Sequence, residues 1–198
     1  MESNVIKQVL ARMRPGTVFP VNQFFTDTVQ RNTVEKELSR LVEQGVLQRF
    51  RRGIYYKPVQ SSFFGKVLPN PTEIAQAIAT LNYAKIIPNG AMALHMLGLT
   101  TQMPLKLTYL NDKLHKTEMI GNTPVVFKRI SSKKLSAAGK KAGLVLSALS
   151  YLGKEEAKSK QIQKKLLQQL TSQDKQDLLK AVQAYPLWLQ EIVEALTV

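Results

Sequence analysis

The spacing of apolar residues changes at Gly45, and this change constrains the fold more than any other feature of the chain. Before it, apolar residues recur at the spacing of one buried helix face: Val34, Leu38, Leu41 and Val42. After it, residues 46–51 alternate as a strand does, Arg52 and Gly53 form a tight turn, and residues 54–57 return as a second strand. The pattern predicts a helix followed at once by a β-hairpin with a basic tip.

Three shorter elements are predicted before this helix and hairpin. An amphipathic helix ends at residues 14–16, where proline and glycine stop it. Residues 17–19 form a short strand, and residues 20–25 form a short helix that opens with proline. Residues 26–28 offer caps for the helix that follows. The order helix, strand, helix, helix, strand, turn, strand specifies a winged helix-turn-helix over residues 1–58.

The third helix of such a motif is narrow enough to enter the major groove of DNA, where its first side chains reach base edges. Arginine donates two hydrogen bonds to guanine, and Asn or Gln pairs with adenine. Arginines at the hairpin tip suit contact with phosphates or the minor groove. We therefore expect ten residues to contact DNA: Gln30, Arg31, Asn32, Thr33, Lys36, Arg40, Arg49, Arg51, Arg52 and Tyr55. The alternative is a winged helix that contacts protein and keeps a solvated basic face. Glu35, Glu37 and Glu43 lie on the same helix and reduce its net positive charge, and Glu35 and Glu37 either orient neighbouring cations or keep the helix soluble.

The charge of the chain favours a polyanionic partner. Lys and Arg number 28 and Asp and Glu 14, so the formal net charge is +14. DNA, RNA or an anionic membrane surface are the first candidates. The basic and acidic residues number 10 and 5 in residues 1–58, 9 and 3 in residues 59–135, and 9 and 6 in residues 136–198. Because the excess is spread along the chain, a disordered basic arm is not its source.

Several classes of protein are disfavoured by what the sequence lacks. It has no cysteine and only two histidines, His95 and His115, so we expect no thiol chemistry and no metal site. No glycine-rich nucleotide motif is present, and we expect neither an enzyme nor a cofactor. The apolar runs are far shorter than the ~20 residues of a membrane span, and the first residues do not resemble a secretory signal. We expect a cytoplasmic protein without a membrane partner.

The rest of the chain mixes helix and strand patterns. The polar stretch after Pro58 is predicted to be a linker. Beyond it we expect a helix capped by Thr72, a second helix over residues 91–97, and strands over residues 86–88, 106–110 and 125–130. From about residue 136 the pattern is helical to the end. The predicted fold class is α+β: a winged helix-turn-helix, then a mixed α/β domain over residues 59–198 with a helical C-terminal tail.

Two stretches resemble the AbiEi-type antitoxins of bacteria. Residues 86–104 are similar to their "G-A-x-A … L-G-L-T-x-Q-x-P" stretch, and residues 45–56 are similar to their "G-x-L-x-R-x-x-R-G-x-Y" wing. The resemblance covers about residues 1–135. The positions that match individually are Arg49, Arg52, Gly53, Tyr55, Gly90, Leu97, Gly98 and Leu99.

The resemblance implies two activities. Such antitoxins bind their own operator through the winged helix and repress their operon. Their C-terminal part neutralises a nucleotidyltransferase-like toxin encoded beside them, in a type IV toxin–antitoxin system of abortive infection. The implied partners are operator double-stranded DNA and that toxin. Two alternatives stay open: a stand-alone winged-helix transcriptional regulator whose second domain senses a signal, and an RNA-binding interaction protein.

Overall fold

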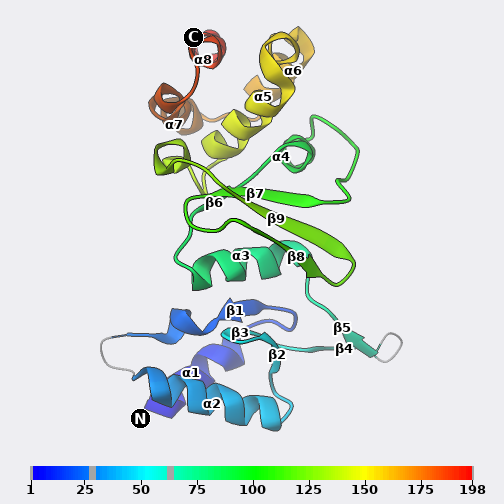
Figure 1. Cartoon of the computed structure of the whole chain (residues 1–198), viewed down its shortest axis with the longest axis vertical. Helices are drawn as coiled ribbons and strands as arrows, with labels where there is room; N and C mark the ends of the chain where they lie inside the picture. Colours follow the sequence, from blue (N-terminus) through cyan, green and yellow to red (C-terminus); the bar gives the residue numbers. More distant parts are fainter. Residues whose placement is uncertain (1, 27–29, 62–64, 198) are drawn as a thin grey trace. The chain divides into compact units, whose positions relative to one another are not determined.

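The computed structural model describes residues 2–26, 30–61 and 65–197, and shows an α+β protein (Figure 1). The chain divides into two compact units, Met1–Tyr83 and Ala84–Val198. The predicted α+β class is confirmed at this level. The division lies after residue 83, whereas the sequence pattern places a boundary near Pro58.

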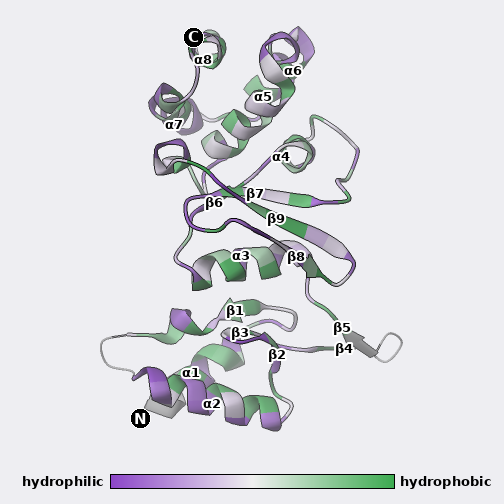
Figure 2. Ribbon diagram, viewed as in Figure 1, coloured by the Kyte–Doolittle hydropathy of each residue, from purple (hydrophilic) through white to green (hydrophobic). Residues whose placement is uncertain are grey.

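The first unit is built from helices packed on a small antiparallel sheet. Its elements are α1 (Glu2–Arg12), β1 (Val18–Pro20), η1 (Val21–Phe24), α2 (Arg31–Glu43), β2 (Gln48–Arg51), β3 (Ile54–Tyr56), β4 (Val59–Ser61), β5 (Gly65–Val67) and α3 (Pro71–Leu81). The first three strands form a sheet in the order β1-β3-β2. Val34 and Leu38 of α2 are fully buried against Ile6 and Phe19, so the predicted apolar face of this helix is in the core. Along α2, hydrophilic and hydrophobic residues alternate as an amphipathic helix requires (Figure 2).

The end of α2 uses a glycine in the left-handed region. Gly45 has φ +72°, which side chains other than glycine rarely adopt. Its N–H donates to the Val42 carbonyl, and the N–H of Val46 donates to the Leu41 carbonyl, both at 3.0 Å. These bonds satisfy carbonyls that the end of a helix would otherwise leave open. The predicted helix stop at Gly45 is therefore confirmed.

The start of α2 differs from the expectation. Gln30 is the N-cap residue, with extended backbone and no capping hydrogen bond from its side chain. Of the three residues expected to supply caps, Asp27 and Thr28 lie outside the described residues. The first turns of α2 contain no acidic residue before Glu35 and begin with Arg31. No acidic side chain in the first turn of α2 therefore neutralises the positive end of its helix dipole.

Two local predictions after the hairpin are wrong. The stretch after Pro58 is not a linker: it forms β4, which pairs antiparallel with β5. Strand pairing satisfies the backbone groups of this polar segment, which composition alone does not reveal. The cap of α3 is Asn70 rather than Thr72, because the Asn70 side chain accepts the Thr72 N–H at 2.9 Å. α3 packs on β1, and its last residue, Leu81, joins the core of the first unit.

The second unit is a four-stranded sheet followed by helices. Its elements are β6 (Ile86–Pro88), α4 (Ala91–Met96), β7 (Leu107–Asn111), β8 (Lys116–Ile120), β9 (Thr123–Arg129), η2 (Ser132–Leu135), α5 (Lys141–Ala157), α6 (Lys160–Leu167), α7 (Ser172–Ala181), η3 (Val182–Ala184) and α8 (Leu187–Thr197). The strand order is β6-β7-β9-β8, with β7 and β9 parallel and the other pairs antiparallel. Strand β8 was not expected from the sequence. After β9 every described element is helical.

Helix α5 organises the helical part of the second unit. It contacts β6, α4, α7 and α8, and within this unit the helices gather on one side of the sheet (Figure 1). Val145 and Leu149 of α5 are fully buried. A Cβ built on Gly143 would overlap the carbonyl oxygen of Ala137 and lie 3.1 Å from Cδ1 of Ile87. The close seating of α5 on the chain around it therefore requires glycine at this position. Among the described residues, no helix combines the length and apolarity needed to cross a bilayer.

Candidate nucleic-acid interface

The outer face of α2 carries most of the residues that we expect to contact DNA. Five of them are exposed, and Thr33 is partly buried: Gln30, Arg31, Asn32, Thr33, Lys36 and Arg40. Asn32, Lys36 and Arg40 lie on the face opposite Val34 and Leu38, which the core covers completely. Burial of one face thus leaves the other available to a partner.

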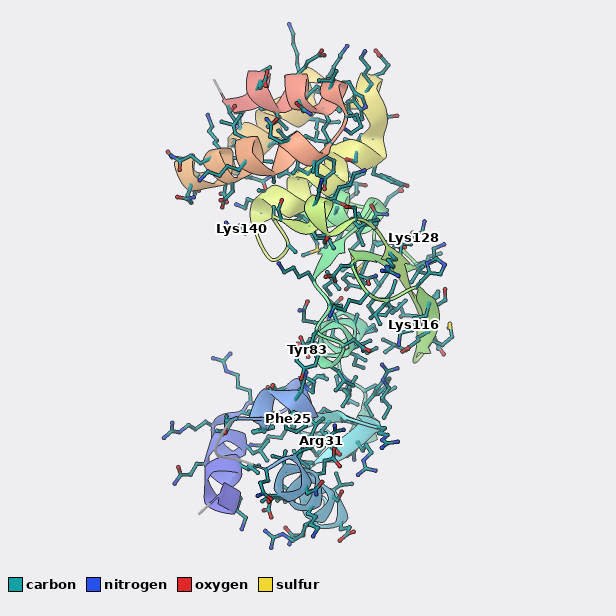
Figure 3. The ribbon with its side chains drawn as sticks, turned by 60° about the vertical axis from the view of Figure 1, so that its left-hand side comes forward. Phe25, Arg31, Tyr83, Lys116, Lys128 and Lys140 are labelled. Atoms are coloured by element: carbon teal, nitrogen blue, oxygen red, sulfur yellow. The ribbon has the colours of Figure 1, made fainter. Side chains whose placement is uncertain are left out.

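Arg31 is held in place at the start of α2. Its Nε donates to Oε1 of Glu35 at 2.8 Å, and its guanidinium lies 5.6 Å from the centroid of the Phe25 ring (Figure 3). The hydrogen bond to Glu35 raises the pKa of Arg31 above its already high value. The guanidinium is therefore a permanent cation beside the positive end of the helix dipole, where an anion is favoured.

Glu37 does not offset this positive surface as a free carboxylate. It is 8% exposed, and its Oε1 accepts from Nη2 of Arg40 at 2.7 Å. Lys7 of α1 places its Nζ 4.0 Å from the same oxygen. Two cations thus surround one carboxylate, and Arg40 keeps donor groups directed toward solvent. Glu37 therefore pairs with cations inside the first unit and does not add an isolated negative charge to this surface.

The β2–β3 hairpin brings further arginines to the same side of the first unit. Gly53 makes its turn with φ +79°, and a Cβ there would lie 3.1 Å from Leu81. The register between the strands shifts between Arg49 and Arg51, which turns the tip of the hairpin. Arg52 is exposed at this tip, and Arg51 is partly buried.

Arg49 joins the hairpin to α2. Its guanidinium lies 5.4 Å from the centroid of the Tyr55 ring, and its Nη2 donates to Oγ of Ser39 at 3.1 Å. Tyr55 is only 4% exposed and stacks on Phe19, with ring centroids 6.1 Å apart. Tyr55 thus supports Arg49 from the core of the first unit.

A groove of about 480 Å³ lies between α2 and the hairpin. Three cationic side chains line it, together with Glu35 and Ser39: Arg31, Arg49 and Arg52. A shallower hollow of about 560 Å³ follows α2, and three further predicted residues line it: Asn32, Lys36 and Arg40. The structure therefore brings seven of the ten expected residues onto one continuous stretch of surface, since Tyr55 also lines the groove and since Glu35 and Ser39 line both hollows. Gln30, Thr33 and Arg51 line neither.

Two members of this surface were not expected from the sequence. Ser39 accepts from Arg49, and Phe25 lies against Arg31. Ser39 is one helical turn after Glu35 on the outer face of α2, so the helical spacing alone identifies its side. The Phe25 contact joins two elements across residues 27–29, and no periodicity signals it. In the part of the chain that the structure describes, no three acidic or histidine side chains converge to hold a metal ion.

The fold and this groove define an α+β protein with an arginine-lined surface on its first unit. The chain belongs to the DUF6088 family, a family of unknown function, whose model matches residues 5–178. No curated protein matches the chain. Among solved structures, the chain is similar to the RV2827C protein from Mycobacterium tuberculosis, with 13% sequence identity and a TM-score of 0.47. That match covers 99% of this chain and 76% of the other.

Proposed function

We propose that the chain is a DNA-binding repressor of the antitoxin type, whose first unit contains a winged helix-turn-helix. The observation that supports this best is the groove between α2 and the β2–β3 hairpin, which three arginines line. The order of elements, α1-β1-η1-α2-β2-β3, and the sheet order β1-β3-β2 are those expected of a winged helix. In this assignment α2 is the recognition helix and the hairpin is the wing.

The dimensions of α2 suit a duplex. The thirteen residues of α2 form a helix about 20 Å long. The major groove of B-DNA is about 12 Å wide, so an α-helix of this length can lie within it. In this assignment the exposed Arg31 and Asn32 of its first turn would reach base edges, and the exposed Lys36 and Arg40 would contact the DNA backbone. Arg49 and Arg52 on the wing would contact phosphates beside the groove. The positive dipole end of α2 adds to the same attraction.

The choice of cation also favours nucleic acid for the first unit. Seven of the eight arginines lie within residues 1–83, whereas sixteen of the twenty lysines lie within residues 84–198. Arginine offers a planar fork of donors that matches phosphate and guanine, and it stacks on aromatic rings. The stacking occurs here, since Arg31 lies on Phe25 and Arg49 lies on Tyr55.

The test of DNA binding is a titration of the full chain into a labelled duplex that carries the region upstream of its own gene, at rising salt. We expect the logarithm of the association constant to fall linearly with the logarithm of salt, by about 0.9 per phosphate contacted. Arg52→Ala should reduce the magnitude of that slope by about 0.9, the value for one phosphate contact. Arg12→Ala removes the same charge from the exposed end of α1 and serves as the matched control. Binding without salt dependence, or equal slopes for both variants, would contradict the proposal.

The same assay separates base reading from backbone contact. We expect Arg31→Ala to weaken binding to the upstream duplex by about 1–3 kcal/mol. The difference in binding free energy between the upstream duplex and a scrambled duplex should therefore become smaller. A-form RNA has a major groove too narrow for a helix, so duplex RNA of equal length should compete poorly. Strong competition by that RNA would instead favour the RNA-binding alternative.

The antitoxin part of the proposal is supported by the resemblance of residues 86–104 and 45–56 to AbiEi-type antitoxins. Its test is co-expression with the neighbouring gene from unrelated promoters. We expect the chain to restore growth when that gene arrests it, and the double variant Arg49→Ala, Arg52→Ala to restore growth equally. Operator binding without any rescue would leave the stand-alone regulator as the correct function.

A further inference from the structure

The second unit contains a pocket of about 230 Å³ whose walls come from four separate parts of the chain. Leu110 of β7, Ile130 after β9 and Trp188 in the first turn of α8 supply apolar parts of its lining. Ser150 of α5 and Lys134 of η2 add polar groups. An apolar cavity with a few convergent polar groups is the usual form of a small-molecule site.

Lys134 supplies a positive charge that the described part of the chain does not neutralise. Its Nζ lies 5.5 Å from the centroid of the Tyr185 ring, and its backbone carbonyl accepts from the Tyr185 hydroxyl at 3.1 Å. Burial raises the pKa of Tyr185, so this hydroxyl stays protonated and neutral. Among the residues that the structure describes, no carboxylate pairs with Lys134. A partly buried ammonium beside apolar walls favours an anionic ligand.

The hydroxyl groups on α5 have different roles. Ser147 is 2% exposed and donates to the carbonyl of Pro88 at 2.8 Å, which fixes this side of the pocket to the end of β6. Ser150 is exposed on the same helix and lines the pocket opening. Ser150 can therefore donate to a ligand, whereas the Ser147 proton is already engaged.

We propose that this pocket binds a small carboxylate with an aromatic or branched apolar body. Lys134 pairs with the carboxylate, Ser150 donates to it, and Trp188 and Ile130 contact the apolar part. The cavity has room for a molecule on the order of ten non-hydrogen atoms, since one water takes about 30 Å³ of liquid volume. The site lies within the second unit and does not depend on DNA binding by the first.

Trp188 is the only tryptophan of the chain, so its fluorescence reports on this pocket. The test is a titration of the full chain with benzoate, phenylacetate and isovalerate, and with their neutral amides as matched controls. We expect a saturable change in fluorescence with at least one of these carboxylates, and at least about tenfold weaker binding of its amide. No saturable change with any of the three, or equal binding of acid and amide, would overturn the proposal.

Three lysine variants test the role of the charge. Lys134→Met should weaken the carboxylate by about ten- to a hundredfold, as loss of a charged hydrogen bond does. Lys133→Met removes the exposed neighbouring charge and should leave binding unchanged. Lys134→Arg keeps the cation and should retain binding, which separates lost charge from lost folding. Equal affinities of the Met variants, or no binding by Lys134→Arg when its circular dichroism matches that of the parent chain, would overturn the assignment of Lys134.

Discussion

The two units carry their positive charge in different ways. In the first, arginines from α2 and the hairpin line one groove and are held by aromatic rings and hydrogen bonds. In the second, lysines are distributed over separate elements: Lys116 on β8, Lys128 on β9 and Lys140 before α5 (Figure 3). Two of these lysines are paired locally, Lys116 with Glu118 and Lys140 with Asp177. Net charge therefore does not locate a binding surface, and our proposal depends instead on the oriented and supported arginines of the first unit.

The largest expected effect comes from matched truncations in the two cores. Leu38 and Leu149 are both fully buried, one in each unit. Leu38→Ala and Leu149→Ala should each lower the free energy of unfolding by about 2–5 kcal/mol, measured by urea denaturation. Below the unfolding transition, only Leu38→Ala should also weaken DNA binding, because Leu38 seats α2. An equal loss of DNA affinity in Leu149→Ala would break the distinction between the units.

A smaller effect is expected where α5 approaches its neighbours most closely. Gly143→Ala introduces a methyl group that overlaps the Ala137 carbonyl. We expect this variant to lose about 1–3 kcal/mol of stability, the usual cost of overpacking. Ser150→Ala, at an exposed position of the same helix, is the control and should change stability by less than about 0.5 kcal/mol. Unchanged stability of Gly143→Ala would show that α5 is seated less closely than described.

Exchanging the type of cation sharpens the comparison further. Arg49→Lys keeps the charge but cannot reproduce the guanidinium's fit to the Tyr55 ring and Ser39. We expect DNA affinity to fall by about 0.5–1.5 kcal/mol with little change in the salt slope. Lys128→Arg in the second unit should leave DNA affinity unchanged. If Arg49→Lys and Lys128→Arg change the DNA affinity equally in the titration, the orientation of the arginines does not determine DNA binding.

The smallest effect concerns a helix cap in the second unit. Thr171 and Asp174 form a capping box at the start of α7, and their hydrogen bonds lower the pKa of Asp174. A carboxylate whose pKa is depressed on folding stabilises the fold above its unfolded pKa of about 4, and this contribution is lost as pH falls through the folded pKa. Thr171→Ala should cost about 0.5–1 kcal/mol of stability at neutral pH, because the cap is exposed, and less at pH 2. A cost independent of pH would contradict the role of Asp174, and DNA binding should be unaffected throughout.

The sequence predicts the parts of the first unit that periodicity controls. The apolar face of α2, the stop at Gly45 and the turn at Gly53 each depend on local spacing or on glycine, and all three occur in the structure. The contact of Arg49 with Ser39 depends on where the hairpin packs, and no local pattern encodes it. The burial of Tyr55 is hidden for the same reason, because packing covers both faces of β3 and leaves all three of its residues buried.

Less of the second unit can be predicted from the sequence, because its sheet depends on pairing between strands that lie far apart in the chain. Strand β8 is a polar edge strand with Lys116, Glu118 and exposed Met119, so it lacks the alternation that marks a strand. The parallel pairing of β7 with β9 requires a crossover that the sequence does not specify. From the sequence alone, Asn111 is predicted only to be a turn residue. In the structure it ends β7 and is fully buried, and its side-chain amide donates to the carbonyls of Leu114 and Lys128.

The most direct test of the central claim is methylation interference at guanine N7, which lies in the major groove. The full chain is bound to the upstream duplex after sparse methylation, and bound and free DNA are compared. We expect N7 methylation within the bound site to exclude the duplex from the complex, because α2 occupies the major groove there. Binding that tolerates N7 methylation at every guanine of the site would contradict a recognition role for α2.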